Sequence, residues 1–428
     1  MIDFVTIISD QKDELRLSSK WISRQQETSI NLDSDLAQIV IGVRRSGKST
    51  LCMKRLIESG VNFAYVNFDD ERFLDLKPQQ LNDVLSALYR VYGNFTHLFL
   101  DEIQNIKGWH LFVNRLLRQG IKMILTGSNA NLLSSELSTH LTGRYNQIEL
   151  YPFSFSEFCD YHQTDKSSLS TKAQALRMRL LDIYMEKGGF PELLSENASD
   201  DYIPSLLHAI LHKDICKRYK VRYPDVLDRL ANVLLNNYCQ EISYTKVAKT
   251  LEVSSVHTVQ RYIDYLSEAY LTCNAFKFSF KSMLRQTNRK AYAIDPTFVL
   301  QRGNTIMLDN KGWMIENIVY LELLRRYRKE TQSIFYIRQS GFEVDFVVTD
   351  SSHILQLIQV TYNWINPSAK QMRRELGGLV KGSNLTRCNA LLLIIYDGQE
   401  GKIEYEGKDI NIIKASNWLS SDSSLNLQ

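Results

Sequence analysis

The first third of the chain alternates short apolar runs with longer stretches in which apolar residues recur every three or four positions. Four runs have the length and apolar character of buried strands: residues 37–43, 63–70, 96–102 and 121–128. Three stretches between them have helical spacing and each ends at a glycine: residues 50–60, 78–93 and 109–120. Strands that alternate with helices predict an α/β fold, a parallel sheet with helices on both faces.

The pattern changes twice further along the chain. Residues 171–190 and 201–219 keep the helical spacing without a strand-like run between them, which predicts a helical region. Strand-like runs return from about residue 290, with one helical stretch at 312–330 among them. We therefore expect three domains, at residues 1–165, 166–290 and 291–428.

Composition narrows the class of protein. The chain has 428 residues, of which 44% are hydrophobic and 23% charged, and these are the proportions of a folded globular protein. The net charge of +3 is too small to indicate a partner by itself. We expect a cytoplasmic protein without a membrane segment, because no apolar run is long enough to cross a bilayer and the six cysteines form no CxxC pair.

A phosphate-binding motif directly follows the first predicted strand. Residues 42–49 read GVRRSGKS and fit G-x-x-x-x-G-K-[ST]. The glycines allow the backbone N–H groups to point at phosphate oxygens, Lys48 adds a positive charge, and the Ser49 hydroxyl is placed to bind Mg²⁺. The residues predicted to bind ATP are Gly42, Val43, Arg44, Arg45, Ser46, Gly47, Lys48, Ser49 and Thr50.

Two acids follow the third predicted strand. Asp101 is placed to hold Mg²⁺ together with Ser49, and Glu102 to activate the water that attacks the γ-phosphate. With Lys48, Glu102 is thus a predicted catalytic residue. The pair favours ATP hydrolysis over a small-molecule kinase. The alternative is a strand that ends in two solvated acids.

Three further polar residues are candidates for the same site. Ser128 and Asn129 follow the fourth predicted strand, beside the acids, where either one is placed to hold the attacking water or to cap a helix. Arg144 is a candidate to contact the γ-phosphate in its own or a neighbouring subunit, and the alternative is a solvated surface arginine.

These motifs together resemble the AAA+-like P-loop ATPases that carry a C-terminal domain of unknown function, DUF4143. The resemblance rests on GVRRSGKST, FLDEIQNIKGWHLFVNRLL, GRYNQIELYPFSFSEF and GGFPELL, and it spans about residues 35–400. It implies an ATP-binding domain, then a winged-helix region, then a domain similar to PD-(D/E)xK nucleases. It also makes Gly42, Gly47, Lys48 and Ser49 the Walker A residues and Asp101 and Glu102 the Walker B residues.

The middle of the chain has a helix-turn-helix rhythm. Val247, Ala248 and Leu251 are expected to pack one helix, and a turn at 252–254 follows it. Ser254 or Ser255 is placed to cap a second helix that carries Val259, Tyr262, Ile263 and Leu266. Residues 271–278 and 289–295 are possible wing strands. The residues available to a DNA major groove are Ser255, His257, Thr258, Gln260 and Arg261. The runs 212–222 and 281–290 each carry a net charge of +4. The alternative is a module that only joins domains or proteins.

The C-terminal region resembles a PD-(D/E)xK core in outline only. Glu316 lies on a predicted helix and Glu343 and Asp345 on a predicted strand, but the next strand carries Gln359 and Thr361 where an active nuclease has Glu and Lys. We therefore expect a degenerate nuclease site with weak or no cleavage.

The motifs together predict an Mg²⁺-dependent ATPase whose nucleotide state controls the winged-helix and nuclease-like module, with double-stranded DNA as the partner. One alternative is a slow NTP-dependent switch that acts on another protein without DNA. A second alternative is an ATP-coupled DNA nuclease. The sequence leaves the oligomeric state open.

Overall fold

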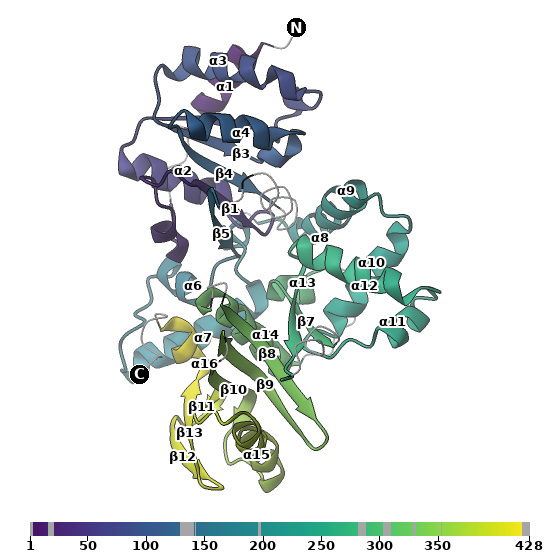
Figure 1. The fold of residues 1–428 in the computed structure, drawn as a ribbon. Coiled ribbons are helices and arrows are strands. Elements are labelled where there is room, and N and C mark those ends of the chain that lie inside the picture. The colour runs from purple at the N-terminus through teal and green to yellow at the C-terminus, as the bar shows by residue number, and fades with distance from the viewer. Residues whose placement is uncertain are drawn as a thin grey trace. The chain divides into compact units, whose positions relative to one another are not determined.

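The computed structural model describes residues 3–15, 21–128, 141, 143–195, 198–280, 288–302, 310–327, 331–351 and 353–421. The chain forms two compact units, one from Met1–Pro152 with Glu268–Tyr270 and one from Phe153–Ser267 with Leu271–Gln428 (Figure 1). No helix in the described ranges combines the length and the apolar character needed to cross a bilayer. The division into three domains stays a prediction.

The N-terminal unit is built on a five-stranded sheet in which all the strands are parallel. The spatial order is β2-β3-β4-β1-β5, so that β4 lies between the strand before the phosphate motif and the strand before the acids. The strands are β1 Ala37–Gly42, β2 Phe63–Asn67, β3 His97–Asp101, β4 Lys122–Gly127 and β5 Tyr145–Leu150. The four predicted strands are thus confirmed.

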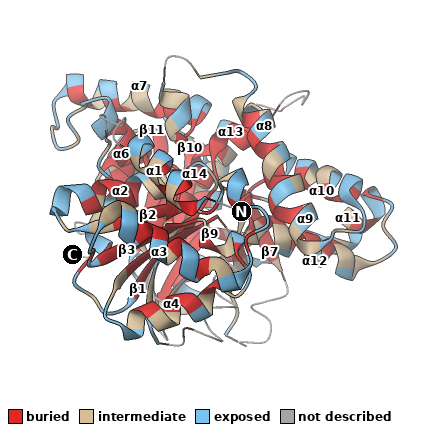
Figure 2. Ribbon diagram, turned by 90° about the horizontal axis from the view of Figure 1, so that it is seen from above, coloured by how far each residue is buried: buried red, intermediate tan, exposed pale blue. Residues whose placement is uncertain are grey.

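Helices cover both faces of this sheet. On one face α2, Lys48–Ser59, packs Leu51 and Leu56 against strand residues such as Val40 and Phe99. Because crossovers between parallel strands are right-handed, α3, Leu81–Tyr92, and α4, Trp109–Arg118, lie on the other face. Figure 2 shows the result, since β1 and β3 are buried along their whole length.

Two elements of this unit were absent from the sequence-based expectation. The first is α1, Phe4–Glu14, which buries Phe4, Ile7 and Ile8 although the segment is polar overall. The second is β5, which pairs with β1 from Ala37 to Gly42. Its outward side chains are polar and only partly buried, so the apolar run that identifies the other strands is missing.

The C-terminal unit begins with helices, as the spacing predicts. They are α6 Phe155–Tyr161, α7 Thr171–Lys187, α8 Tyr202–His208, α9 Lys217–Tyr219, α10 Pro224–Asn236, α11 Tyr244–Thr250 and α12 Val256–Glu268. Between α8 and α9 the residues Ala209–Cys216 form a π-helix.

An eight-stranded sheet follows in the same unit, in the order β12-β13-β11-β10-β9-β8-β6-β7. Its strands are β6 Thr272–Lys277, β7 Arg289–Ala293, β8 Gln332–Gln339, β9 Phe342–Asp350, β10 His353–Trp364, β11 Leu391–Gly398, β12 Gly401–Tyr405 and β13 Lys408–Lys414. The two predicted wing strands, β6 and β7, form an antiparallel pair, and β6 also pairs with β8. The pair therefore belongs to the large sheet.

Two long helices cover opposite faces of the large sheet. Leu376 and Leu379 of α15, Ala369–Thr386, pack in one apolar cluster with Val347 of β9. The neighbouring Phe346 stacks instead on Tyr320 of α14, Lys311–Arg326. Successive side chains of a strand point to opposite faces, so the two helices sandwich the sheet. Two short helices, α13 Pro296–Leu300 and α16 Ala415–Ser420, complete the unit.

Candidate functional site

The phosphate motif forms a tight loop between β1 and α2. Gly42 has a φ of 139°, and a Cβ atom on it would lie 2.0 Å from the carbonyl oxygen of Leu150 on β5. The N–H of Val43 donates to that same carbonyl at 3.3 Å. Gly47, with a φ of 91°, turns the chain into the helix. The edge strand β5 therefore fixes the start of the loop and requires a glycine there.

The lysine of the motif points back at its own loop. Lys48 is 5% exposed, and its Nζ donates to the carbonyl oxygens of Gly42 at 3.1 Å and Val43 at 2.9 Å. These bonds hold an ammonium in the concavity of the loop, at the N-terminus of α2. A phosphate bound there meets both the ammonium and the positive end of the helix dipole.

A second cation, the guanidinium of Arg24, also binds the loop, and the sequence analysis did not identify it. The buried guanidinium of Arg24 donates to the carbonyl of Ser46 at 2.9 Å and to that of Tyr151 at 2.7 Å. Arg24 thus ties the tip of the loop to the residue that follows β5. No motif marks this arginine, because its two partners are backbone atoms far away in sequence.

Asp101 lies at the carboxyl end of β3 and is the centre of a hydrogen-bonded cluster. It accepts from the Ser49 hydroxyl at 2.9 Å, from the Thr126 hydroxyl, and from the Tyr65 hydroxyl at 3.3 Å. Burial raises the pKa of Asp101, although the hydrogen bond from Thr126 opposes the shift. The predicted pairing of Ser49 with Asp101 is therefore present, and a hydroxyl beside a buried carboxylate suits Mg²⁺.

Glu102 differs from Asp101 in exposure and backbone geometry. Its φ is 52°, a conformation that non-glycine residues rarely adopt. The backbone N–H of Glu102 donates to the Thr126 hydroxyl at 3.0 Å, while its carboxylate accepts from the Gln104 amide. The side chain is only half-buried, so it remains accessible to a water molecule in the site.

The remaining residues predicted for this site are Ser128, Asn129 and Arg144. Ser128 is buried beyond the end of β4, but Thr126 of the same strand is the residue that contacts Asp101. Asn129 lies outside the described residues. The structure does not bring Arg144 to the loop: its carbonyl accepts from the N–H of Ala37, at the opposite end of β1. At ~3.3 Å per residue, the five steps from Ala37 to Gly42 span about 16 Å.

The predicted helix-turn-helix residues lie on α11 and α12. Most of the apolar residues expected to pack are buried, namely Ala248, Leu251, Val259, Tyr262, Ile263 and Leu266, whereas Val247 is half-buried. Ser255 caps the second helix by accepting from the N–H of Thr258 at 3.4 Å. The candidate DNA contacts His257 and Arg261 are exposed, and Thr258 and Gln260 are half-buried.

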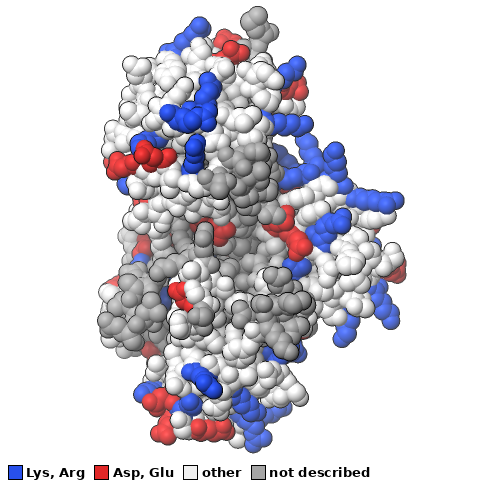
Figure 3. Space-filling model, viewed as in Figure 1, with Lys and Arg blue, Asp and Glu red and all other residues white. Residues whose placement is uncertain are grey.

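Basic side chains gather on the helical part of the same unit. Figure 3 shows blue side chains over the region where α9, α10 and α11 lie. The run 212–222 contributes Lys213, Lys217, Lys220 and Arg222, all exposed. Lys213 lies on the π-helix, a rare element that often occurs at functional sites. We call these four residues the basic run.

The predicted nuclease-like residues also come together, around a cavity of about 800 Å³. Glu316 from α14, Glu343 and Asp345 from β9, and Gln359 and Thr361 from β10 all line it. So do two residues that the sequence reasoning missed, Lys290 from β7 and Glu375 from α15. We call this cavity the lysine–carboxylate pocket and define it by Lys290, Glu316, Glu343, Asp345, Gln359 and Glu375.

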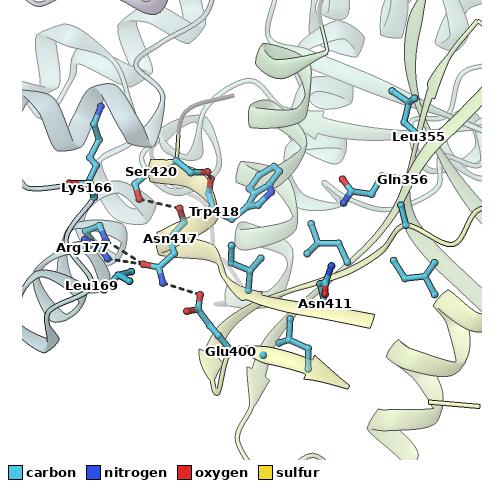
Figure 4. Close-up of a pocket in the computed structure, with 18 of the residues that line it drawn as sticks. Lys166, Leu169, Arg177, Leu355, Gln356, Glu400, Asn411, Asn417, Trp418 and Ser420 are labelled. Atoms are coloured by element: carbon cyan, nitrogen blue, oxygen red, sulfur yellow. Dashed lines mark hydrogen bonds between the residues drawn. The ribbon is translucent and has the colours of Figure 1, made fainter. Parts of the chain in front are cut away.

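A larger cavity of about 1050 Å³ in the same unit has no comparable chemistry. Figure 4 shows three of its polar side chains bonded in a row: the guanidinium of Arg177 donates to Asn417 at 3.0 Å, and Asn417 donates to Glu400 at 2.9 Å. Arg177 also donates to two backbone carbonyls. These hydrogen bonds indicate a structural role for Arg177, Asn417 and Glu400.

Comparison with known proteins agrees with the motif at the start of the chain. A family model described as an AAA domain matches residues 34–159. A second, described as a domain of unknown function, DUF8612, matches residues 178–302. It is a different domain from the DUF4143 that the resemblance implied. The N-terminal part is thus an AAA domain of the P-loop ATPase class.

Two relatives match nearly the whole chain. Uncharacterized protein MJ1544 of Methanocaldococcus jannaschii is 32% identical over 421 residues, which cover 95% of this chain and 93% of that protein. An uncharacterized protein of Haemophilus influenzae is 30% identical and covers 81% of this chain and 88% of its own length. The chain therefore belongs to the same family as these two proteins.

Solved structures are similar to a lesser degree. AMPPCP-bound DnaA from Aquifex aeolicus has 16% identity and a TM-score of 0.26, over 57% of this chain and 86% of that one. The RuvB Holliday junction branch migration motor of Thermotoga maritima has a TM-score of 0.25, over 64% of this chain and 94% of that one. Likenesses this slight say nothing of function.

Proposed function

We propose that the protein binds Mg²⁺–ATP in the loop at residues 42–50 and hydrolyses it. The observation that carries the proposal is the contact between the Ser49 hydroxyl and Asp101, at the carboxyl edge of the sheet and next to a buried lysine. Ser49 and Asp101 would hold Mg²⁺, which would neutralise part of the charge of the phosphates. Lys48 would bind the phosphates.

Glu102 then orients the attacking water and accepts its proton. Its half-exposed carboxylate and the position of its backbone N–H against Thr126 support this role. Thr126 and Ser128, at the end of β4, are candidates to hold the same water, and Asn129, which lies outside the described residues, is a candidate from the sequence alone. The place of Arg144 at the far end of β1 leaves a neighbouring subunit as its only route to a γ-phosphate.

The test separates nucleotide binding from turnover. Glu102→Gln is expected to bind a fluorescent ATP analogue as wild type does but to lose about 10²–10⁴-fold in ATPase rate, because only the base is removed. Lys48→Ala is expected to lose the binding itself. Steady-state phosphate release and analogue titration measure the two effects. Equal turnover by Glu102→Gln and wild type would exclude Glu102 as the base.

We further propose that the helical region binds double-stranded DNA and that the nucleotide state controls this contact. Support comes from the exposed basic run and from the exposed His257 and Arg261 on α12. In this arrangement lysines contact phosphates, while Ser255, His257, Thr258, Gln260 and Arg261 are the candidates to face base edges. The alternative, a switch that acts on another protein, requires no DNA affinity.

The dependence of DNA binding on salt distinguishes the two. Each neutralised phosphate contributes about −0.9 to the slope of log K against log salt concentration. The double substitution Lys217→Ala and Lys220→Ala should therefore flatten the slope by about 2. The matched control replaces Lys381 and Lys402, two exposed lysines of the same unit, and should leave the slope unchanged. Absence of binding at low salt would favour the protein-directed switch.

A further inference from the structure

The peptide between Ser46 and Gly47 lies at the tip of the phosphate loop. Arg45 and Gly47, on either side of Ser46, have φ angles of 66° and 91°. Left-handed residues in such a loop turn successive N–H groups to one side, where they form a concave site for anions. In a trans peptide the C=O and the following N–H point in opposite directions. The Ser46 carbonyl therefore points away from an anion towards which the Gly47 N–H points.

The guanidinium of Arg24 binds that carbonyl. Its Nη1 donates to the carbonyl oxygen of Ser46 at 2.9 Å, and its Nη2 donates to that of Tyr151 at 2.7 Å. Arg24 is 7% exposed, so both bonds lie in the protein interior. A planar guanidinium presents its N–H groups at fixed angles, and the two carbonyls are thus held in one relative position. A side chain outside the motif therefore sets the direction of the Ser46–Gly47 peptide.

The segment that carries Arg24 is itself attached to α2. The backbone N–H of Arg24 donates to Oε1 of Glu27 at 2.7 Å. Lys54 of α2 donates to Oε1 and Oε2 of the same carboxylate, at 2.8 and 2.7 Å. Lys54 is 6% exposed, and salt screens a buried ion pair less than a surface pair. The backbone of Arg24 is thus tied to the helix that follows the loop, while its side chain is tied to the tip of the loop.

We infer that Arg24 is a positioning residue of the nucleotide site, which keeps the Gly47 N–H directed at the phosphates before the nucleotide binds. The inference rests on the proposed binding of Mg²⁺–ATP. Arg24 acts through the Ser46 carbonyl, and the loop makes the contact with the ligand. A site that is ordered in advance pays a smaller entropic cost on binding, which strengthens its affinity.

This role affects binding more than turnover. The N–H groups of such a loop surround the α- and β-phosphates, which ATP and ADP share. Loss of Arg24 should therefore weaken the binding of both nucleotides by the same factor. An interaction made equally in the ground state and the transition state lowers KM without changing kcat. Turnover at saturating ATP should thus stay close to that of wild type, while KM rises.

The first test titrates full-length wild type, Arg24→Lys and Arg24→Gln with a fluorescent ATP analogue, and uses ADP as a competitor. Both variants should bind about 10-fold more weakly or worse, because neither side chain holds two carbonyls at once. The number of binding sites per chain should stay unchanged. A merely structural arginine predicts the reverse, fewer sites with unchanged affinity, because part of the protein is then misfolded.

The matched control is Arg177→Gln. Arg177 is 1% exposed and likewise donates to two backbone carbonyls, but it lies in the other unit. This variant should bind the analogue with the affinity of wild type. Equal affinity of wild type, Arg24→Lys and Arg24→Gln overturns the inference and leaves the proposed function standing. Absence of binding by wild type overturns the proposed function itself.

Chemical rescue distinguishes the guanidinium of Arg24 from its contribution to folding. Guanidinium ion at millimolar concentration is added to Arg24→Ala, where it can occupy the space of the missing side chain. It should restore several-fold of the lost analogue affinity, whereas sodium chloride at the same ionic strength should not. Equal effects of the two salts would assign the loss to the fold and overturn the inference. If Arg24→Ala fails to fold, the affinities and site numbers of Arg24→Lys and Arg24→Gln decide.

Discussion

At the scale of single residues, Asp101 is an acidic residue in the interior of the N-terminal unit. The residue is 3% exposed, and burial raises its pKa. The folded state therefore favours the protonated form more than the unfolded chain does. The ionised form costs stability, and this cost begins as the pH rises above the ordinary aspartate value of about 3.8 and is complete above the raised pKa. The hydrogen bonds that the Ser49 and Thr126 hydroxyls donate to Asp101 reduce this loss of stability without removing it.

We therefore expect Asp101→Asn to raise the Tm of the nucleotide-free protein at neutral pH while it abolishes Mg²⁺-dependent ATP hydrolysis. The rise should be about 2 °C or more, the shift that ~1 kcal/mol produces in a domain of this size. It should shrink as the pH falls towards 4, because Asp101 then becomes neutral. Thermal melts across pH measure it, with the exposed Asp75→Asn as control. A lower Tm for Asp101→Asn would contradict this account.

At the scale of elements, the sequence predicted the helices, strands and loop that have a recognisable local pattern of residues. Four strands of the N-terminal sheet, its three covering helices and the loop at residues 42–49 follow from apolar spacing and glycine positions, and the structure confirms them. The edge strand β5 was not predicted, because its outward side chains are polar and only partly buried. Yet β5 decides the geometry of the loop, since the Leu150 carbonyl lies against Gly42.

The residues of the candidate sites divide in the same way. Lys48, Ser49 and Asp101 occupy motif positions; Ser49 contacts Asp101, and Lys48 donates to the Val43 carbonyl of its own loop. Arg24, Thr126 and Glu375 act through contacts between segments distant in sequence, which no spacing rule reveals. Lys290 is the clearest case. A motif search looks for the carboxylate and the lysine at the strand positions that Gln359 and Thr361 occupy. Lys290 precedes these two residues by 69 and 71 positions. The position of Lys290 is explained by its ion pairs with Glu316 and Glu343, and not by a fixed spacing along the chain.

At the scale of the whole molecule, the chain path links the N-terminal unit directly to α12 and β6. Residues Glu268–Tyr270 belong to the N-terminal unit, although the preceding residues of α12 and the following strand β6 belong to the other unit. The Tyr270 hydroxyl donates to Glu149 of β5 at 2.9 Å, and the Tyr151 hydroxyl donates to the other oxygen of the same carboxylate at 2.9 Å. Glu149 immediately precedes Leu150, whose carbonyl holds the phosphate loop. A change in the loop on ATP binding thus has a short covalent and hydrogen-bonded route to the end of α12.

This route predicts that Tyr270→Phe uncouples α12 from the nucleotide. Loss of a hydrogen bond to a charged acceptor costs about 1.5–3 kcal/mol, enough to loosen the attachment of Glu268–Tyr270 to β5. Amide hydrogen exchange should show that a non-hydrolysable ATP analogue slows exchange in both α2 and α12 of wild type, but only in α2 of Tyr270→Phe. Tyr161→Phe, which removes a hydroxyl bonded to the Leu194 carbonyl, is the matched control and should behave as wild type. If α12 responds equally in wild type and Tyr270→Phe, the signal does not pass through Tyr270, and the nucleotide must reach the helical region by another path or not at all.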